Sequence, residues 1–137
     1  MSIIRSACGI ILDETRTRLL AVMPGWTDMY ILPGGKMKDN ESPKECLVRE
    51  IQKEELKGIT IVCYDHFKRY DLGKALFDDG DLQMETYLVQ IEGIPEPSGE
   101  IKKVEWISEQ DSIDKRVRLA PVFERLLPDL KERRLLL

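Results

Sequence analysis

The chain has 137 residues, which suffices for one domain with its own hydrophobic core and is too short for two ordinary domains. Apolar residues make up 42% of the sequence and charged residues 34%, which excludes a disordered chain and predicts a single globular domain over residues 1–137. The formal net charge of −4 argues against general binding to nucleic acid or to an anionic membrane. It still allows an anionic small substrate, because a bound divalent cation reverses the local field.

The cysteines and the apolar runs indicate where the protein works. Cys8, Cys46 and Cys63 are odd in number and too widely spaced for a zinc site, so they are expected to be reduced thiols. No stretch reaches the roughly 18 apolar residues of a membrane span. Arg5 and Asp13 interrupt the N-terminal apolar residues, where a secretory signal needs an unbroken core. These features predict a cytoplasmic protein.

Three strands are predicted in the first quarter of the chain. Apolar residues dominate residues 3–12 and 18–23, with a polar turn between them, and this pattern predicts a hairpin. Residues 24–28 break the second strand, and a short strand over residues 29–32 follows. These strands lead directly into the most distinctive stretch of the sequence, residues 33–59.

This stretch reads as a glycine-rich turn followed by a helix with a well-defined start. Ser42 is a good N-cap, and Pro43 suits the first helical position, where its missing N–H costs nothing. Glu45 completes a capping box with Ser42. The position of the first turn is therefore fixed by the sequence.

The helix start assigns faces to the residues that follow. On a regular helix at about 100° per residue, Leu47, Val48 and Ile51 cluster on a buried face. Glu50 and Glu54 then lie one turn apart along the edge of that face. Two stacked carboxylates repel each other, so helix stability alone gives no reason for them. Paired carboxylates suit Mg²⁺ or Mn²⁺, which complete their shells with water and substrate phosphate.

Two glycines precede this helix. Gly34 and Gly35 allow backbone carbonyls and amides to approach the same cation or phosphate closely. Lys36 follows them and is a candidate phosphate contact, although an exposed loop lysine is usually only solvated. Turn and helix together predict a divalent metal site that binds a phosphate-containing substrate.

Three strands and a second helix are predicted after this stretch. Strand-like runs occupy residues 60–70, 82–91 and 101–107. A proline-rich loop is expected over residues 93–99. Apolar residues at helical spacing predict a helix over residues 118–134 that covers one face of the sheet, with Pro128 expected to kink or end it. Strands around two helices give an α+β fold with a mixed sheet.

The run from Gly35 to Glu54 resembles the Nudix hydrolase box, written G-x5-E-x7-R-E-U-x-E-E-x-G-U with U aliphatic. Six of its nine defined positions match at their stated spacing. The departures are Lys53, which stands where the family has the first glutamate of its E-E pair, and the Gly58–Ile59 dipeptide, which arrives two residues late. The resemblance implies an α/β/α sandwich with a mixed β-sheet, in agreement with the fold class above.

The resemblance also implies roles for the residues of the box. Glu50 and Glu54 are expected to bind the metal, with the Gly34 carbonyl as a third ligand. Arg49 is expected to hold the loop through Glu41 and to orient the site.

A further acidic residue is expected to complete the site. The family has a loop glutamate before the strand at residues 101–107, which serves as a further ligand or as the general base. Glu100 is the candidate for this role, with Glu96 and Glu85 as alternatives. A solvated loop carboxylate is the competing reading of Glu100.

Lys53 leaves two outcomes open. Its ammonium group either replaces one metal ion in charge, which leaves a slower hydrolase with a single Mg²⁺, or pairs with Glu50 and abolishes metal binding. Glu55 supplies the missing carboxylate only if the helix unwinds before Gly58, because on a regular helix it points into the apolar arc.

The function implied is a Mg²⁺-dependent pyrophosphohydrolase that acts on a nucleoside diphosphate linked to another group. Nucleoside triphosphates, including oxidised ones such as 8-oxo-dGTP, are favoured weakly by the small size of the chain. Trp26 and Tyr30 are candidates for stacking on the base, although each also suits a core, and Lys36 and Lys53 are candidates near the phosphates. The alternatives are a catalytically weakened nucleotide-binding module and a structural, partner-binding domain. Many members of the family are dimers, so a homodimer is a further expectation.

Overall fold

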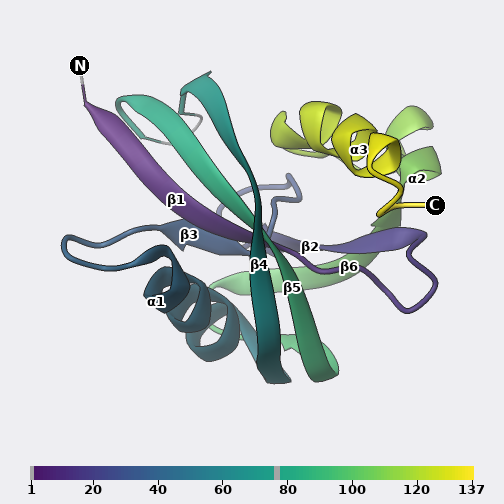
Figure 1. The fold of residues 1–137 in the computed structure, drawn as a ribbon, viewed down its shortest axis with the longest axis horizontal. Helices are drawn as coiled ribbons and strands as arrows, with labels where there is room; N and C mark the ends of the chain where they lie inside the picture. Colours follow the sequence, from purple (N-terminus) through teal and green to yellow (C-terminus); the bar gives the residue numbers. More distant parts are fainter. Residues whose placement is uncertain (1, 76–77) are drawn as a thin grey trace.

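A computed structural model describes residues 2–75 and 78–137 of the chain. Two β-sheets lie between two layers of helix (Figure 1). The strands are β1 (Ile3–Ile10), β2 (Arg18–Pro24), β3 (Gly34–Lys36), β4 (Leu56–Lys74), β5 (Asp81–Pro97) and β6 (Ile101–Ser108). The helices are α1 (Pro43–Leu47), the π-helix η1 (Val48–Glu55), α2 (Glu109–Ile113) and α3 (Val122–Glu132).

The larger sheet is mixed, with the strand order β3-β1-β5-β4. Strands β1 and β5 are parallel, whereas β1–β3 and β4–β5 are antiparallel. The second sheet pairs β2 with β6 in antiparallel fashion. The hairpin predicted for the first two strands is therefore wrong. The chain does turn back after β1, but only Leu12 and Leu19 form a bridge there, because the edges of β1 are taken by β3 and β5.

Alternation along the strands divides the core between the two helical layers. On β1, Cys8 and Ile10 belong to the cluster that packs against α3, whereas Ala7, together with Ile11 just after the strand, belongs to the cluster that packs against α1 and η1. Figure 1 shows α1 with its π-helical continuation on one side of the strands and α3 on the other. This confirms the predicted α+β sandwich with a mixed sheet.

Two predicted features after the box differ from the structure. Strand β5 continues to Pro97, although a loop had been predicted over residues 93–99. Gly58 and Gly93 explain this extension: both have positive φ (81° and 100°), and a Cβ on Gly93 would collide with the carbonyl oxygen of Gly58. Two glycines thus let the strands stay close through a bulge. Pro128 lies inside α3 and does not end it.

Helix length also bears on membrane association. In residues 2–75 and 78–137, no helix is both long enough and apolar enough to cross a membrane.

Candidate active site

The first half of the box helix forms as the sequence predicts. Ser42 Oγ accepts a hydrogen bond from the Glu45 amide at 3.1 Å, and Glu45 Oε1 accepts one from the Ser42 amide at 3.0 Å. Pro43 is the first residue of α1. The capping box is therefore confirmed. The glycine turn, Gly34 and Gly35, is the start of strand β3 and not a loop as predicted, and residues 37–42 connect β3 to α1.

The second half of the helix is wider than predicted. From Val48 to Glu55 the chain forms a π-helix, in which hydrogen bonds span five residues instead of four. At its end the Leu56 amide donates to the Ile51 carbonyl, which is such a five-residue bond. The expectation of a regular helix at about 100° per residue is therefore wrong for this segment.

A wider helix accommodates one extra residue without moving those on either side of it. Relative to the box pattern R-E-U-x-E-E, the chain carries one surplus residue between Gln52 and the Glu54–Glu55 pair. The π-helix absorbs this residue, so that Glu55 lies one helical turn beyond Glu50. Two features of the sequence indicate the surplus residue: Gly58 lies later than in the box pattern, and the Glu-Glu dipeptide of that pattern is intact at Glu54 and Glu55.

Glu55, which a regular helix would point into the apolar arc, lies at the glycine turn. The residue is only 8% exposed, and its Oε1 accepts a hydrogen bond from the Gly34 amide at 2.7 Å. Burial raises the pKa of this carboxyl to about 8, and the negative charges of Glu50 and Glu54 add to the increase. The helix did not need to unwind to bring Glu55 to the glycine turn, because widening was sufficient.

The two glycines make room for this arrangement in different ways. Gly34 has a φ of +136°, and a Cβ there would collide with the Ala7 carbonyl oxygen of the neighbouring strand. A Cβ on Gly35 would lie 2.7 Å from the carboxyl carbon of Glu50. Gly34 is therefore required by the backbone, and Gly35 by the space that the Glu50 carboxylate occupies.

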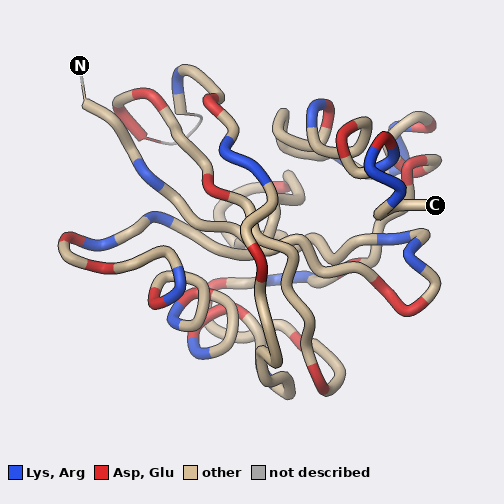
Figure 2. Tube along the Cα trace, in the orientation of Figure 1, with Lys and Arg blue, Asp and Glu red and all other residues tan. Residues whose placement is uncertain are grey.

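Arg49 ties the acidic residues to the loop. Its guanidinium donates to Glu41 at 2.7 and 2.9 Å and to the Lys36 carbonyl at 3.0 Å. The same group donates to Glu50 Oε1 and to Glu54 Oε2, both at 2.7 Å. The ion pair with Arg49 lowers the pKa of Glu41 to about 2. The structure thus brings Glu41, Arg49, Glu50 and Glu54 together beside the glycine turn. We call the four carboxylates of Glu41, Glu50, Glu54 and Glu55 the acidic corner. Figure 2 shows charges of both signs along α1 and η1.

The carboxylates of the acidic corner suit a hard divalent cation, although their oxygen atoms do not converge on a common point. Within residues 2–75 and 78–137, no three Asp, Glu, His or Cys side chains already converge as a ligand set. Arg49 instead bridges Glu50 and Glu54. Nevertheless, burial raises the pKa values of Glu50 and Glu55, so both carboxylates would gain from a cation. Carboxylate oxygens are also the ligands that Mg²⁺ and Mn²⁺ prefer.

Lys53 is exposed, and no ion pair joins it to Glu50 in the part of the chain that the structure describes. The outcome in which Lys53 pairs with Glu50 is therefore not observed. The guanidinium that neutralises Glu50 belongs to Arg49.

The candidate base lies in a loop fixed to the end of η1. The Ser98 amide donates to the Glu55 carbonyl at 2.9 Å, and a Cβ on Gly99 would lie 2.6 Å from the Glu54 carbonyl oxygen. The Glu100 carbonyl accepts from the Gly25 amide at 2.8 Å. The loop that carries Glu100 is therefore attached to the backbone at the end of η1 and to Gly25.

The two alternatives to Glu100 lie on strand β5. Glu85 Oε2 is 3.4 Å from His66 Nε2, and Glu96 is the register neighbour of Lys57 across the β4–β5 pair. Neither of these contacts involves the glycine turn.

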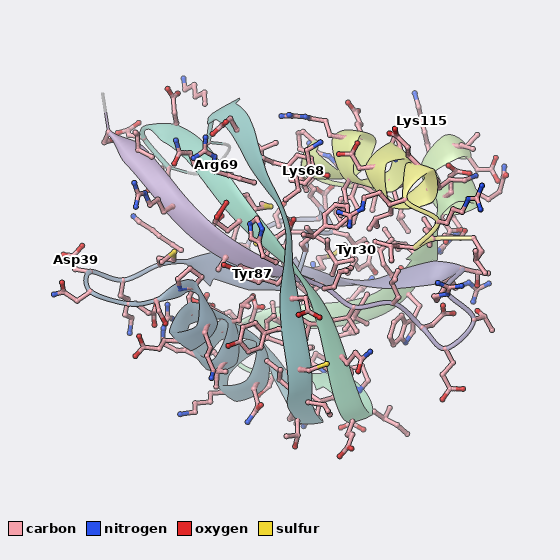
Figure 3. The ribbon with its side chains drawn as sticks, viewed as in Figure 1. Tyr30, Asp39, Lys68, Arg69, Tyr87 and Lys115 are labelled. Atoms are coloured by element: carbon pink, nitrogen blue, oxygen red, sulfur yellow. The ribbon has the colours of Figure 1, made fainter. Side chains whose placement is uncertain are left out.

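A cavity of about 240 Å³ lies on the α3 side of the glycine turn. Gly34, Gly35 and Lys36 form the part of its lining that meets the acidic corner, and Trp26 also lines it. Lys36 Nζ is 3.5 Å from Asp78 Oδ2 there. Tyr30 is only 6% exposed and lies in the core beneath α3 (Figure 3), which agrees with the core reading of this residue given above as the alternative to base stacking.

Comparisons with known proteins identify the family and the fold of the chain. The NUDIX domain family model matches residues 3–130. An 8-oxo-dGTP diphosphatase of Proteus vulgaris is 39% identical over 51 residues, which are 35% of this chain and only 46% of that protein. A MutT protein from Aliivibrio salmonicida or Vibrio cholerae has a TM-score of 0.72 at 23% identity, over 96% of this chain and 99% of that chain. The E. coli ORF135 protein has a TM-score of 0.71 at 21% identity, over 98% and 94%.

The two structural likenesses show the fold, and the family model spans most of the chain. The resemblance drawn from the Gly35–Glu54 stretch is thereby confirmed. Because the family model covers residues 3–130, this chain belongs to the NUDIX domain family.

Proposed function

We propose that this chain is a pyrophosphohydrolase that requires Mg²⁺ or Mn²⁺ and cleaves a nucleoside diphosphate linked to another group. The observation that carries the proposal is the buried Glu55 carboxylate on the Gly34 amide, with the Glu50 carboxylate beside Gly35. Such a set of acids costs stability in a metal-free protein, because the carboxylates are desolvated and repel each other. A structural role alone gives no reason for it.

Glu50, Glu54 and Glu55, together with the Gly34 carbonyl, would hold the cation, which when bound neutralises phosphoryl charge and lowers the pKa of a coordinated water. Arg49 keeps Glu50 and Glu54 at the glycine turn when the site is free. Glu100, in the loop fixed to the end of η1, is the proposed acceptor of the proton from the attacking water.

The proposed substrate is a nucleoside triphosphate, including oxidised ones such as 8-oxo-dGTP. The relative named for 8-oxo-dGTP supports this choice over its 51 matched residues. The cavity supports it as well, because about 240 Å³ is below the roughly 300–1,000 Å³ usual for drug-sized ligands and suits a single ring system. Trp26 lines the cavity and is the proposed aromatic contact for the base.

The remaining expectations are part of the same proposal. Residues 1–137 would act as one domain in the cytoplasm. Neither nucleic acid nor a membrane is a proposed partner, and the proposed oligomeric state is a homodimer, by analogy with other members of the family. The net charge of −4 supports a small anionic substrate over a polyanion, since only a local cation reverses the field.

One observation favours a second candidate, a nucleotide-binding module with little turnover. Arg49 bridges Glu50 and Glu54 and so competes with any cation for the same carboxylates. A module of this kind would bind nucleotides without releasing phosphate or pyrophosphate.

A panel of nucleoside triphosphates, 8-oxo-dGTP and diphosphate-linked nucleotides, assayed with Mg²⁺ and with Mn²⁺, decides between the two candidates. The hydrolase proposal predicts metal-dependent product release that falls by about 100-fold or more in Glu50→Gln. Glu124→Gln, on the exposed face of α3, is the matched control and should keep full activity. Binding without turnover by the wild-type protein would instead support the module.

A further inference from the structure

The floor of the cavity is the face of β1 that points toward α3. Ile4, Ser6 and Cys8 alternate along this strand and line the cavity together. Leu32 and Met84 contribute further apolar walls. The strand is held on both edges, by β3 and by β5, so its side chains have fixed positions.

Ser6 is the exception on this apolar floor. The residue is 5% exposed, and its hydroxyl oxygen is buried without a hydrogen-bond partner among the residues that the structure describes. Its neighbour on the same face, Cys8, remains a neutral thiol, because burial raises its pKa far above the ordinary range and outweighs the opposite effect of the Ser6 hydroxyl beside it. A neutral thiol is only a weak hydrogen-bonding partner, so this contact leaves the Ser6 hydroxyl able to bind a stronger one.

The other polar side chains of the described lining lie toward solvent. Lys36, Lys74 and Asp78 are exposed, and Lys36 pairs with Asp78. These exposed groups can contact phosphates where the cavity opens to solvent. They cannot contact a ring that lies on the floor formed by β1. Ser6 is therefore the only buried hydroxyl, amide or charged side chain among the described residues that line the cavity.

We infer that Ser6 is a specificity-determining residue, whose hydroxyl binds the edge of a purine-sized ring that carries an oxo or ring N–H group. This inference rests on the proposed function insofar as the cavity holds the base of the nucleotide. Apolar walls bind any flat ring by dispersion and burial and so discriminate little between rings. A single buried hydroxyl discriminates more, because a ring without a polar edge leaves it unpaired.

The test compares ligands that differ only at that edge. Inosine and guanosine 5′-monophosphates carry an oxo and an N–H group, whereas purine riboside 5′-monophosphate carries neither. Calorimetric titration without metal should show about 10-fold tighter binding of the first two by the wild-type protein. In Ser6→Ala this ratio should fall below about two-fold, while the affinity for purine riboside monophosphate stays the same.

Cys8→Ala is the matched control, because it shortens a neighbouring side chain on the same floor and keeps the hydroxyl. It should change the affinities for all three ligands equally and preserve their ratio. The melting temperature of Ser6→Ala should equal or exceed that of the wild type, since the variant removes a buried hydroxyl without a partner. A lower melting temperature would show that the hydroxyl has an internal partner and would overturn the inference.

The remaining outcomes separate this inference from the hydrolase proposal. An unchanged ratio in Ser6→Ala, no preference in the wild type, or no binding of any of the three ligands overturns the role of Ser6. Hydrolysis in the substrate panel would stand in each of those cases. Selective binding that depends on Ser6, in a protein that hydrolyses nothing, would support Ser6 and reject the hydrolase.

Discussion

The two halves of the box helix, α1 and η1, are adjacent in the chain and differ in how their sequence determines their shape. In α1, Ser42, Pro43 and Glu45 each form the local contact that their residue type favours. In η1, no local preference explains the π-helix, which instead accommodates a surplus residue while Glu50 and Glu55 both reach the glycine turn. Capping contacts within the sequence thus determine where the helix begins. The contacts of Glu50 and Glu55 with the glycine turn determine that it continues as a π-helix.

The largest effect on hydrolysis is expected at Glu55, the carboxylate that the π-helix places at the glycine turn. Glu55→Gln should reduce metal-dependent hydrolysis by about 100-fold or more, because it removes a charged ligand from the corner while keeping an acceptor for the Gly34 amide. Initial rates on the best substrate of the panel, with Mg²⁺ at saturation, measure this. Activity within a few-fold of the wild type, as expected of the control Glu124→Gln, would exclude Glu55 from the site.

The same carboxylate predicts how the stability of the metal-free protein depends on pH. Its pKa is about 8 in the folded protein, whereas the ordinary value for a glutamate is 4.5. A raised pKa means that the folded state holds the proton more tightly, so this contribution to stability is complete below about pH 4.5 and is lost as the pH rises through about 8.

Urea unfolding in EDTA from pH 4.5 to 9 checks this dependence. The wild-type protein should lose stability relative to Glu55→Gln across that range, because the amide has no proton to release. A stability difference that does not vary with pH would contradict a protonated, buried Glu55.

A smaller effect is expected at the start of α1. Ser42→Ala should lower the free energy of unfolding by about 1 kcal/mol, because the Glu45 amide loses its acceptor. Ser42→Asp keeps an acceptor and serves as the control in the same denaturant titration. Equal losses in both variants would mean that the cap does not stabilise the helix.

The smallest effect is expected at the surplus residue itself. Lys53 is exposed, so Lys53→Glu should change the hydrolysis rate and the metal affinity by less than about three-fold. The contrasting expectation, that Lys53 occupies the position of a missing metal-binding glutamate, predicts a clear gain in metal affinity. Titration with Mn²⁺ distinguishes the two.

Much of the fold could be predicted because its signals are local. Apolar runs gave the positions of the main strands, and Ser42 with Glu45 gave the start of the helix. Strand pairing was less accessible: β2 pairs with β6, which lies more than 70 residues further along the chain, and no short-range pattern encodes that partner. Glu55 was considered only on the condition that the helix unwinds, because a period of 3.6 residues was assumed through a segment that does not have it.

The most direct measurement compares two deletions that shorten η1 equally. Removing Lys53 leaves the spacing R-E-U-x-E-E from Arg49 to Glu55, so a regular helix would carry the Glu54–Glu55 pair to the glycine turn. Removing Glu54 leaves the same length with only one carboxylate of the pair. We predict that the Lys53 deletion keeps metal-dependent hydrolysis within about 10-fold of the wild type, while the Glu54 deletion loses about 100-fold or more. Equal losses in the two deletions would contradict the account that the π-helix exists to accommodate Lys53.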